Sequence, residues 1–245
     1  GSPEGKRRAL INEEGLVEVD EAGFSLEPFI LTESGLVTWA DAKVAVSLEK
    51  GGTPLPRVRW KAAGLQLDIL PWVDGAEDEL VLRVTYRLRA KTASTNTRLV
   101  IAVRPFQVDP PWQAFRNLGG ISPIHEIGVS EHGLSIVGRS VTATPQPEMK
   151  GGALFEEGGV LHVLTHDLNS LDQAIHDPSG LGSGFMLWQF PEGGTNLEVT
   201  VSVPFYQNVP PTNSNNRRNA LTRWKSKLGA VRWDVPECAA NAFDC

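Results

Sequence analysis

The residue types best suited to contacting a polar ligand gather in one stretch, RPFQVDPPWQ, which runs from Arg104 to Gln113. The candidate contact residues are Arg104, Gln107, Trp112 and Gln113. Guanidinium and amide groups can satisfy hydroxyls, and an indole ring can stack on the apolar face of a sugar. The proline pair at 110–111 fixes its own φ angles, which stiffens the segment. This stretch therefore predicts a stiff loop that contacts carbohydrate, with packing on the sheet edge or on another domain as the alternative.

A second candidate polar site consists of His125, His162, His166, Asp167 and His176. Histidine and aspartate side chains that meet can bind a metal or act as acid and base. The His125-Glu126 pair is followed by the next histidine only at His132, which is not the HExxH spacing of zinc proteases. We therefore predict a polar site with no metal and no cofactor, and turn or surface roles for these residues are the alternative.

Motifs for covalent catalysis or nucleotide binding are missing from this sequence. It contains no GxSxG, no P-loop and no GxGxxG between a strand and a helix. Carboxylate pairs such as Glu156-Glu157 exist, but glycosidic hydrolysis needs two carboxyls about 5–10 Å apart in space, which neighbours in sequence do not demonstrate. We predict no catalytic residue in this chain.

The net charge and composition of the chain limit the classes of partner that we expect it to bind. The chain of 245 residues has a net charge of −6, and its only basic runs are the short Lys6-Arg7-Arg8 and Arg217-Arg218. A nucleic-acid partner is therefore not expected, because it requires a basic surface that neutralises phosphates. No apolar run is long enough for a membrane span. Localisation stays open between the cytoplasm and export, and Cys238 and Cys245 are interpreted as free thiols, with a local disulfide as the alternative.

The fold is predicted from hydrophobic periodicity. The apolar run 99–103 indicates a strand buried on both faces, whereas 79–88 alternates and indicates one buried and one wet face. The polar turn 91–97 between them predicts a hairpin. Further strands are expected at 16–20, 24–31, 36–48, 64–73, 121–127, 134–144, 153–155, 160–164, 185–190 and 197–203. This spacing predicts an all-β, large antiparallel β-supersandwich.

One helix is expected, over residues 217–228, where Leu221, Trp224 and Leu228 recur at helical spacing and Gly229 follows. The predicted organisation is a lead-in over 1–15, a sandwich domain over 16–210, and a linker helix with the start of a downstream domain over 211–245.

Four stretches resemble part of a protein family: FSLEPF at 24–29, LVTWAD at 36–41, the segment 54–60, and RPFQVDPPWQ. They are similar to large bacterial glycoside-hydrolase-like proteins that are often labelled discoidin or coagulation-factor-5/8-type. In these proteins a galactose-mutarotase-like β-supersandwich precedes a six-hairpin α/α toroid, and the resemblance covers roughly residues 16–236.

The resemblance implies a supersandwich, a linker helix at 216–229 and a catalytic toroid beyond Cys245. The acidic catalytic residues of such enzymes lie on the toroid, so no catalytic residue is carried over to this chain. True mutarotases use a histidine and a glutamate that are separated, whereas His125 and Glu126 are adjacent here. The expected function is an accessory, carbohydrate-associated sandwich with the toroid as partner. The alternatives are a free-standing mutarotase, epimerase or lyase, and a structural spacer.

Overall fold

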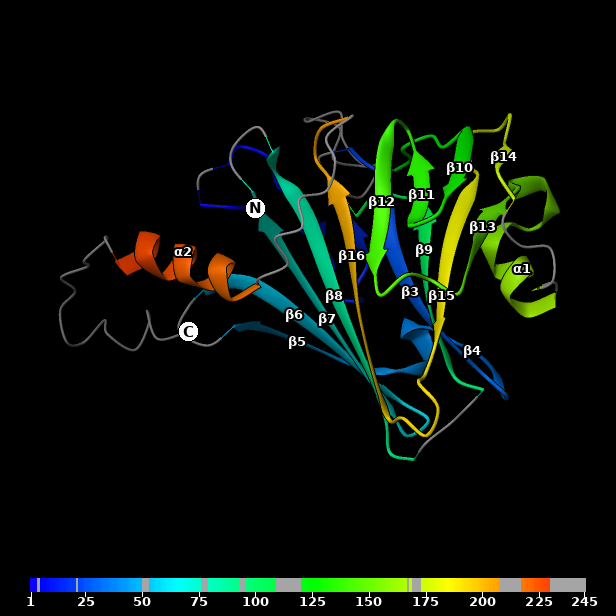
Figure 1. Cartoon of the computed structure of the whole chain (residues 1–245), viewed down its shortest axis with the longest axis horizontal. Coiled ribbons are helices and arrows are strands. Elements are labelled where there is room, and N and C mark those ends of the chain that lie inside the picture. The colour runs from blue at the N-terminus through cyan, green and yellow to red at the C-terminus, as the bar shows by residue number, and fades with distance from the viewer. Residues whose placement is uncertain are drawn as a thin grey trace.

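The structure is a computed structural model of the chain (Figure 1). It describes residues 1–3, 5–20, 22–49, 53–75, 79–92, 96–108, 120–166, 168, 173–207 and 217–229. Several predicted features lie outside these residues, namely Trp112, Gln113, Asp167, Cys238 and Cys245.

Two antiparallel sheets form the body of the molecule. Within the described residues, the first has seven strands in the order β1-β2-β3-β9-β15-β13, with β4 also paired to β3. Its strands are β1 (Leu10–Ile11), β2 (Val17–Glu18), β3 (Ser25–Thr32), β4 (Gly35–Val37), β9 (Arg98–Arg104), β13 (Met149–Ala153) and β15 (Ser183–Gln189). The predicted lead-in thus contributes an edge strand, β1.

In the part of the chain that the structure describes, the second sheet has nine strands in the order β14-β10-β11-β12-β16-β8-β7-β6-β5. Its strands are β5 (Lys43–Glu49), β6 (Thr53–Ala62), β7 (Leu65–Asp74), β8 (Val81–Ala90), β10 (Glu126–Ser130), β11 (Gly133–Ile136), β12 (Arg139–Thr144), β14 (Ile175–His176) and β16 (Asn196–Pro204). The prediction of an all-β antiparallel sandwich is confirmed.

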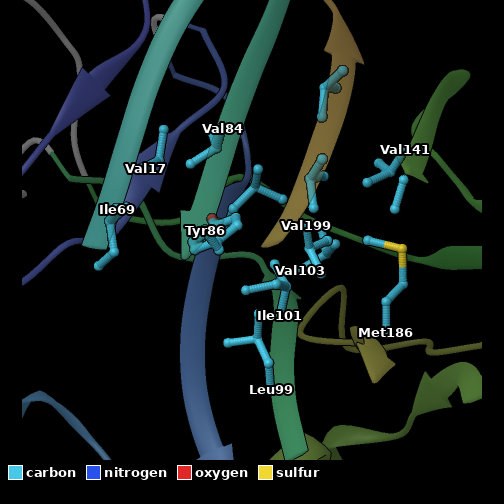
Figure 2. Close-up of a cluster of buried hydrophobic side chains, with 14 of the residues drawn as sticks. Val17, Ile69, Val84, Tyr86, Leu99, Ile101, Val103, Val141, Met186 and Val199 are labelled. Carbon is cyan, nitrogen blue, oxygen red and sulfur yellow. The ribbon is translucent and has the colours of Figure 1, made fainter. Parts of the chain in front are cut away.

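The main core lies between the sheets. Figure 2 shows side chains of the second sheet, such as Ile69, Tyr86 and Val199, gathered with Leu99 and Ile101 of β9. The opposite face of β9 is also covered, since Val100 and Ala102 belong to a second apolar cluster with Phe29, Val160 and Leu164. The prediction of a strand buried on both faces is confirmed, and this double burial explains its unbroken apolar run.

Each outer face carries a helix. Helix α1 (Gly159–His166) packs on the first sheet, and α2 (Arg217–Gly229) packs on β6 and β7 of the second, at opposite sides of Figure 1. The described residues also form two short 3₁₀ helices, η1 (Trp39–Asp41) and η4 (Phe155–Glu157). The helix predicted over residues 217–228 is confirmed. Within the described ranges, no helix combines the length and apolar character that a membrane crossing requires.

The prediction of a strand at 160–164 is wrong, because these residues form α1. The apolar run is too short to distinguish the hydrophobic period of a helix from that of a strand. Val160 and Leu164 are both almost fully buried, four residues apart, as expected for one face of a helix. Gly158 and Gly159, with φ of 92° and 64°, turn the chain into that helix.

The hairpin predicted across 91–97 is also wrong. Strand β8 pairs with β7 and β16, whereas β9 pairs with β3 and β15, so the connection crosses from one sheet to the other. A similar local error concerns 134–144, which is a hairpin of β11 and β12 around Val137 and Gly138 rather than one strand. Both turn residues have positive φ, 51° and 71°, and valine is uncommon in that conformation, so the turn was not evident from the sequence.

Tyr86 is a buried residue whose replacement is expected to stabilise the fold. Its side chain is fully buried in the main core, and its hydroxyl has no hydrogen-bond partner among the described residues. Burial also raises the pKa of this hydroxyl, because the charged form loses its solvation. We expect Tyr86→Phe to increase the free energy of unfolding by about 1 kcal/mol, because an unsatisfied buried group is removed. Urea denaturation measures the change, and a loss of stability would show that the hydroxyl has a partner.

Candidate functional site

Arg104, the first residue of the candidate loop, is engaged within the fold. Its Nη1 donates to Glu27 Oε2 at 2.7 Å, and its guanidinium carbon lies 4.6 Å from the centre of the Phe106 ring. Both partners of the ion pair are mostly buried, with side-chain exposures of 19% and 14%. Arg104 therefore anchors the end of β9 at least as much as it presents donors to a ligand.

The base of the loop is closed by backbone pairing. Gln107 donates its N–H to the Gly120 carbonyl at 3.0 Å, and Ser122 donates to the Pro105 carbonyl at 2.6 Å. The buried Glu18 accepts the N–H of Val108 at 2.7 Å. The first two contacts pair residues 105–107 with 120–122, and the third ties Val108 to β2. Trp112 and Gln113 lie outside the described residues.

Two of the predicted histidines, His125 and His176, lie at one edge of the second sheet, just before β10 and in β14. Glu126 of β10 pairs in register with His176 of β14, and His176 Nδ1 lies 3.6 Å from Glu126 Oε1. His125 and Glu126 line an open groove of about 380 Å³ over β10 and β11. The side chains of His176 and Glu126 are 69% and 81% exposed, so solvent screens their interaction.

The other two histidines, His162 and His166, lie on α1. Their rings stack with centroids 4.6 Å apart, as residues one helical turn apart can, and Thr165 Oγ1 lies 2.7 Å from His166 Nδ1. The predicted polar site is thus distributed over α1 and the β10–β14 edge. The described part of the chain holds no group of three histidine, cysteine, aspartate or glutamate side chains that could bind a metal ion.

Asp177 acts as a structural link beside these histidines. Its Oδ2 accepts the N–H of Phe155 at 2.7 Å, and its Oδ1 accepts the N–H of Ser179 at 2.8 Å. Its own carbonyl lies 3.1 Å from His125 Nδ1. Burial acts to raise the pKa of Asp177, but the hydrogen bonds from Ser179 and Phe155 outweigh burial and hold that pKa below its usual range. Asp177 therefore ties the β14 loop to the start of η4.

A third polar cluster was missed by the sequence reasoning. The Asp68 side chain is completely buried on the outer face of the second sheet, between β6 and β8. Its carboxylate accepts from Arg59 Nε at 2.6 Å and from Arg57 Nε at 3.1 Å. Arg89 Nη1 lies 3.5 Å away. Alternating arginines within 57–59 and 83–89 were the available signal, but only strand pairing brings them around one carboxylate.

Helix α2 is seated on the same outer face. Ala220 is buried against Leu55 and Trp72, with Leu221 and Trp224 packed beside them. Arg217 Nη2 donates to Glu49 Oε2 at 2.7 Å, and Arg223 Nη2 donates to the Gly75 carbonyl at 3.2 Å. The hydrogen bond from Arg217 lowers the pKa of Glu49. Apolar contact and charge pairing together set the position and direction of the helix.

This seating can be tested by a matched pair of substitutions. We expect Ala220→Glu to release α2, because a carboxylate would be forced against Leu55 and Trp72. Amide hydrogen exchange over 217–229 should then accelerate by at least about tenfold while the sheets keep their protection. Ser226→Glu, an exposed position on the same helix, is the control and should leave exchange unchanged. Equal protection in both variants would contradict the seating.

Comparison with known proteins gives a similarity of fold. No family model matches the chain, and no curated protein matches it. Among solved structures, the chain is similar to a bacterial glucoamylase that was crystallised in complex with acarbose. The TM-score is 0.66 at 8% identity, and the match covers 99% of this chain and 37% of the glucoamylase chain. The chain thus spans little more than a third of the length of that protein, and the similarity is one of fold.

Proposed function

We propose that this chain is a non-catalytic accessory β-sandwich of a carbohydrate-active multidomain protein, in which it supports a catalytic α/α toroid and contacts glycan. The observation that carries the proposal is the structural match: nearly all of this chain corresponds to a minor part of a glucoamylase. The seated helix α2 supports it, because a helix fixed by Arg217 and Arg223 would give a following domain a defined starting direction.

The exposed histidines support a second candidate, a free-standing sugar-active enzyme. His125 and Glu126 share one groove with His176 beside them, so an acid and a base could meet there. Incubation of the chain with a panel of nitrophenyl glycosides, maltooligosaccharides and freshly dissolved aldoses separates the two. The accessory role predicts no turnover and no acceleration of anomer exchange. Activity that disappears in His125→Ala or Glu126→Gln would replace the accessory role with the enzyme.

Glycan contact is proposed for segment 104–113, in which the backbone N–H groups of Gln107 and Val108 are bound by Gly120 and Glu18. We expect Trp112→Ala to weaken binding of a neutral glycan by about tenfold, which corresponds to the loss of one aromatic stacking contact. Trp39→Ala removes a tryptophan of η1 that is 41% exposed, and serves as the control. A glycan screen followed by calorimetry measures the effect. Unchanged binding in Trp112→Ala would remove this segment from the proposed site.

A further inference from the structure

The outer face of the second sheet carries a basic patch that extends beyond the Asp68 cluster. Strand register places the residues in adjacent rows: Arg59, Asp68, Arg87 and Glu198 in one, and Lys43, Lys61, Gln66 and Arg89 in the next. With Arg57, the patch has six basic and two acidic side chains, a formal charge of +4. Because the whole chain carries −6, all other residues together carry −10. The positive charge is therefore concentrated on this face.

An open cleft lies at the end of this patch. It has a volume of about 590 Å³ and is lined by Lys61, Gln66, Arg89 and Lys91 together with the 62–65 turn. The turn is held to the β8 end by a hydrogen bond from the Lys91 N–H to the Gly64 carbonyl at 3.3 Å. Ala63 and Gly64 both have positive φ, 48° and 77°, as a tight two-residue hairpin requires. Figure 1 shows this turn at the lower end of the sheets.

Asp68 orients the arginines of the patch but accepts only some of their N–H groups. A guanidinium has five N–H groups, and Asp68 takes the Nε of Arg59 and approaches one terminal nitrogen of Arg89. The side chains of Arg59 and Arg89 remain 33% and 47% exposed. Guanidinium groups held in place by a buried carboxylate keep outward donors for a second anion, and carboxylates suit the bidentate geometry of arginine.

The chemistry of the cleft points to recognition by charge. Among the described residues, none of the side chains that line it is aromatic, so they offer no platform for stacking on a neutral sugar. The patch measures about 19 Å across its five strands and about 13 Å along them, which suits a ligand of a few charges. A long polyanion such as duplex DNA would extend over the negative remainder of the surface. We propose that this face binds a short carboxylate-bearing glycan, an oligouronate. This inference rests on the carbohydrate association proposed above.

The experiment uses trigalacturonate as the probe, maltotriose as the neutral match and a short DNA duplex as an unrelated polyanion. Calorimetry gives dissociation constants at low and high salt. We expect trigalacturonate to bind at least about tenfold more tightly than maltotriose, with weaker binding at high salt because charges are screened. Absence of trigalacturonate binding, or tighter binding of the DNA, would overturn the proposal.

Substitutions test whether trigalacturonate binds at the basic patch. The double variant Lys61→Gln, Arg89→Gln keeps the hydrogen bonds from Arg57 and Arg59 to Asp68. It should therefore fold, and circular dichroism checks its secondary structure. This double variant should lose about tenfold in trigalacturonate affinity. The matched control, Lys225→Gln with Lys227→Gln, removes two exposed charges from α2 and should bind as the unmodified chain does.

A second variant tests the geometry rather than the charge. Arg59→Lys with Arg89→Lys keeps both charges but removes the planar fork, and it should also weaken trigalacturonate binding. Equal affinity of the unmodified chain and the Lys61→Gln, Arg89→Gln variant would refute the site. The outcome is separable from the glycan contact at 104–113, because Trp112→Ala should affect neutral glycan and leave trigalacturonate binding unchanged.

Discussion

Replacement of Trp60 by alanine is expected to lower the free energy of unfolding by about 3–5 kcal/mol, the range for a large aromatic side chain removed from a core. Trp60 is 1% exposed and belongs to the main core between the sheets. Its indole Nε1 also donates to the Glu14 carbonyl at 2.8 Å, which ties the N-terminal segment to β6. Truncation therefore creates a cavity and removes a hydrogen bond at the same time.

One further substitution separates the cavity from the lost hydrogen bond, and another serves as a control at an exposed tryptophan. Trp60→Phe keeps most of the apolar volume but loses the bond to Glu14, so about 1–2 kcal/mol is expected. Trp39→Ala, on the exposed η1, should change stability by less than about 1 kcal/mol. Chemical denaturation at constant pH measures all three. A loss in Trp39→Ala as large as that in Trp60→Ala would contradict the assignment of the core.

Replacement of Asp68 by asparagine is the second change with a large expected effect. The variant would leave three arginines converging on a neutral amide within the sheet face. Breaking a fully buried pair costs about 3–5 kcal/mol, but the arginines are a third or more exposed, so we expect about 2 kcal/mol here. Glu198→Gln is the matched control, because this carboxylate pairs with Arg87 at 2.6 Å on the same face but is 57% exposed. It should lose less than about 1 kcal/mol.

The pH dependence gives an independent check on Asp68. Burial acts to raise its pKa, but the hydrogen bonds from Arg57 and Arg59 outweigh burial and hold the pKa below its ordinary value. A carboxyl whose folded pKa is lowered stabilises the fold above its unfolded pKa of about 3.9, and this contribution is lost as the pH falls through the folded pKa. The stability difference between the unmodified chain and Asp68→Asn should therefore be constant near neutral pH and shrink below about pH 4. A difference that does not change in acid would contradict the ion cluster.

Features of this protein that depend on local periodicity could be predicted from its sequence. The alternation in 197–203 and 79–88 predicted β16 and β8, because side chains of a strand point to opposite faces with a period of two. The unbroken run at 99–103 predicted a doubly buried β9, and helical spacing followed by Gly229 predicted α2. Short apolar runs were less informative, and α1 was mistaken for a strand because eight residues contain little more than two helical turns.

Which elements become neighbours was decided by the tertiary structure. Strands β8 and β9 are consecutive in sequence but belong to different sheets, because β7 and β16 occupy both edges of β8. The same pairing assembles the basic patch: Arg59 and Asp68 are nine residues apart, whereas Arg87 and Glu198 are 111 residues apart. Sequence patterns therefore determined which face each side chain occupies. Only the non-local strand pairing decided which charges meet on that face, because pairing depends on the burial and edges of whole sheets rather than on neighbouring residues.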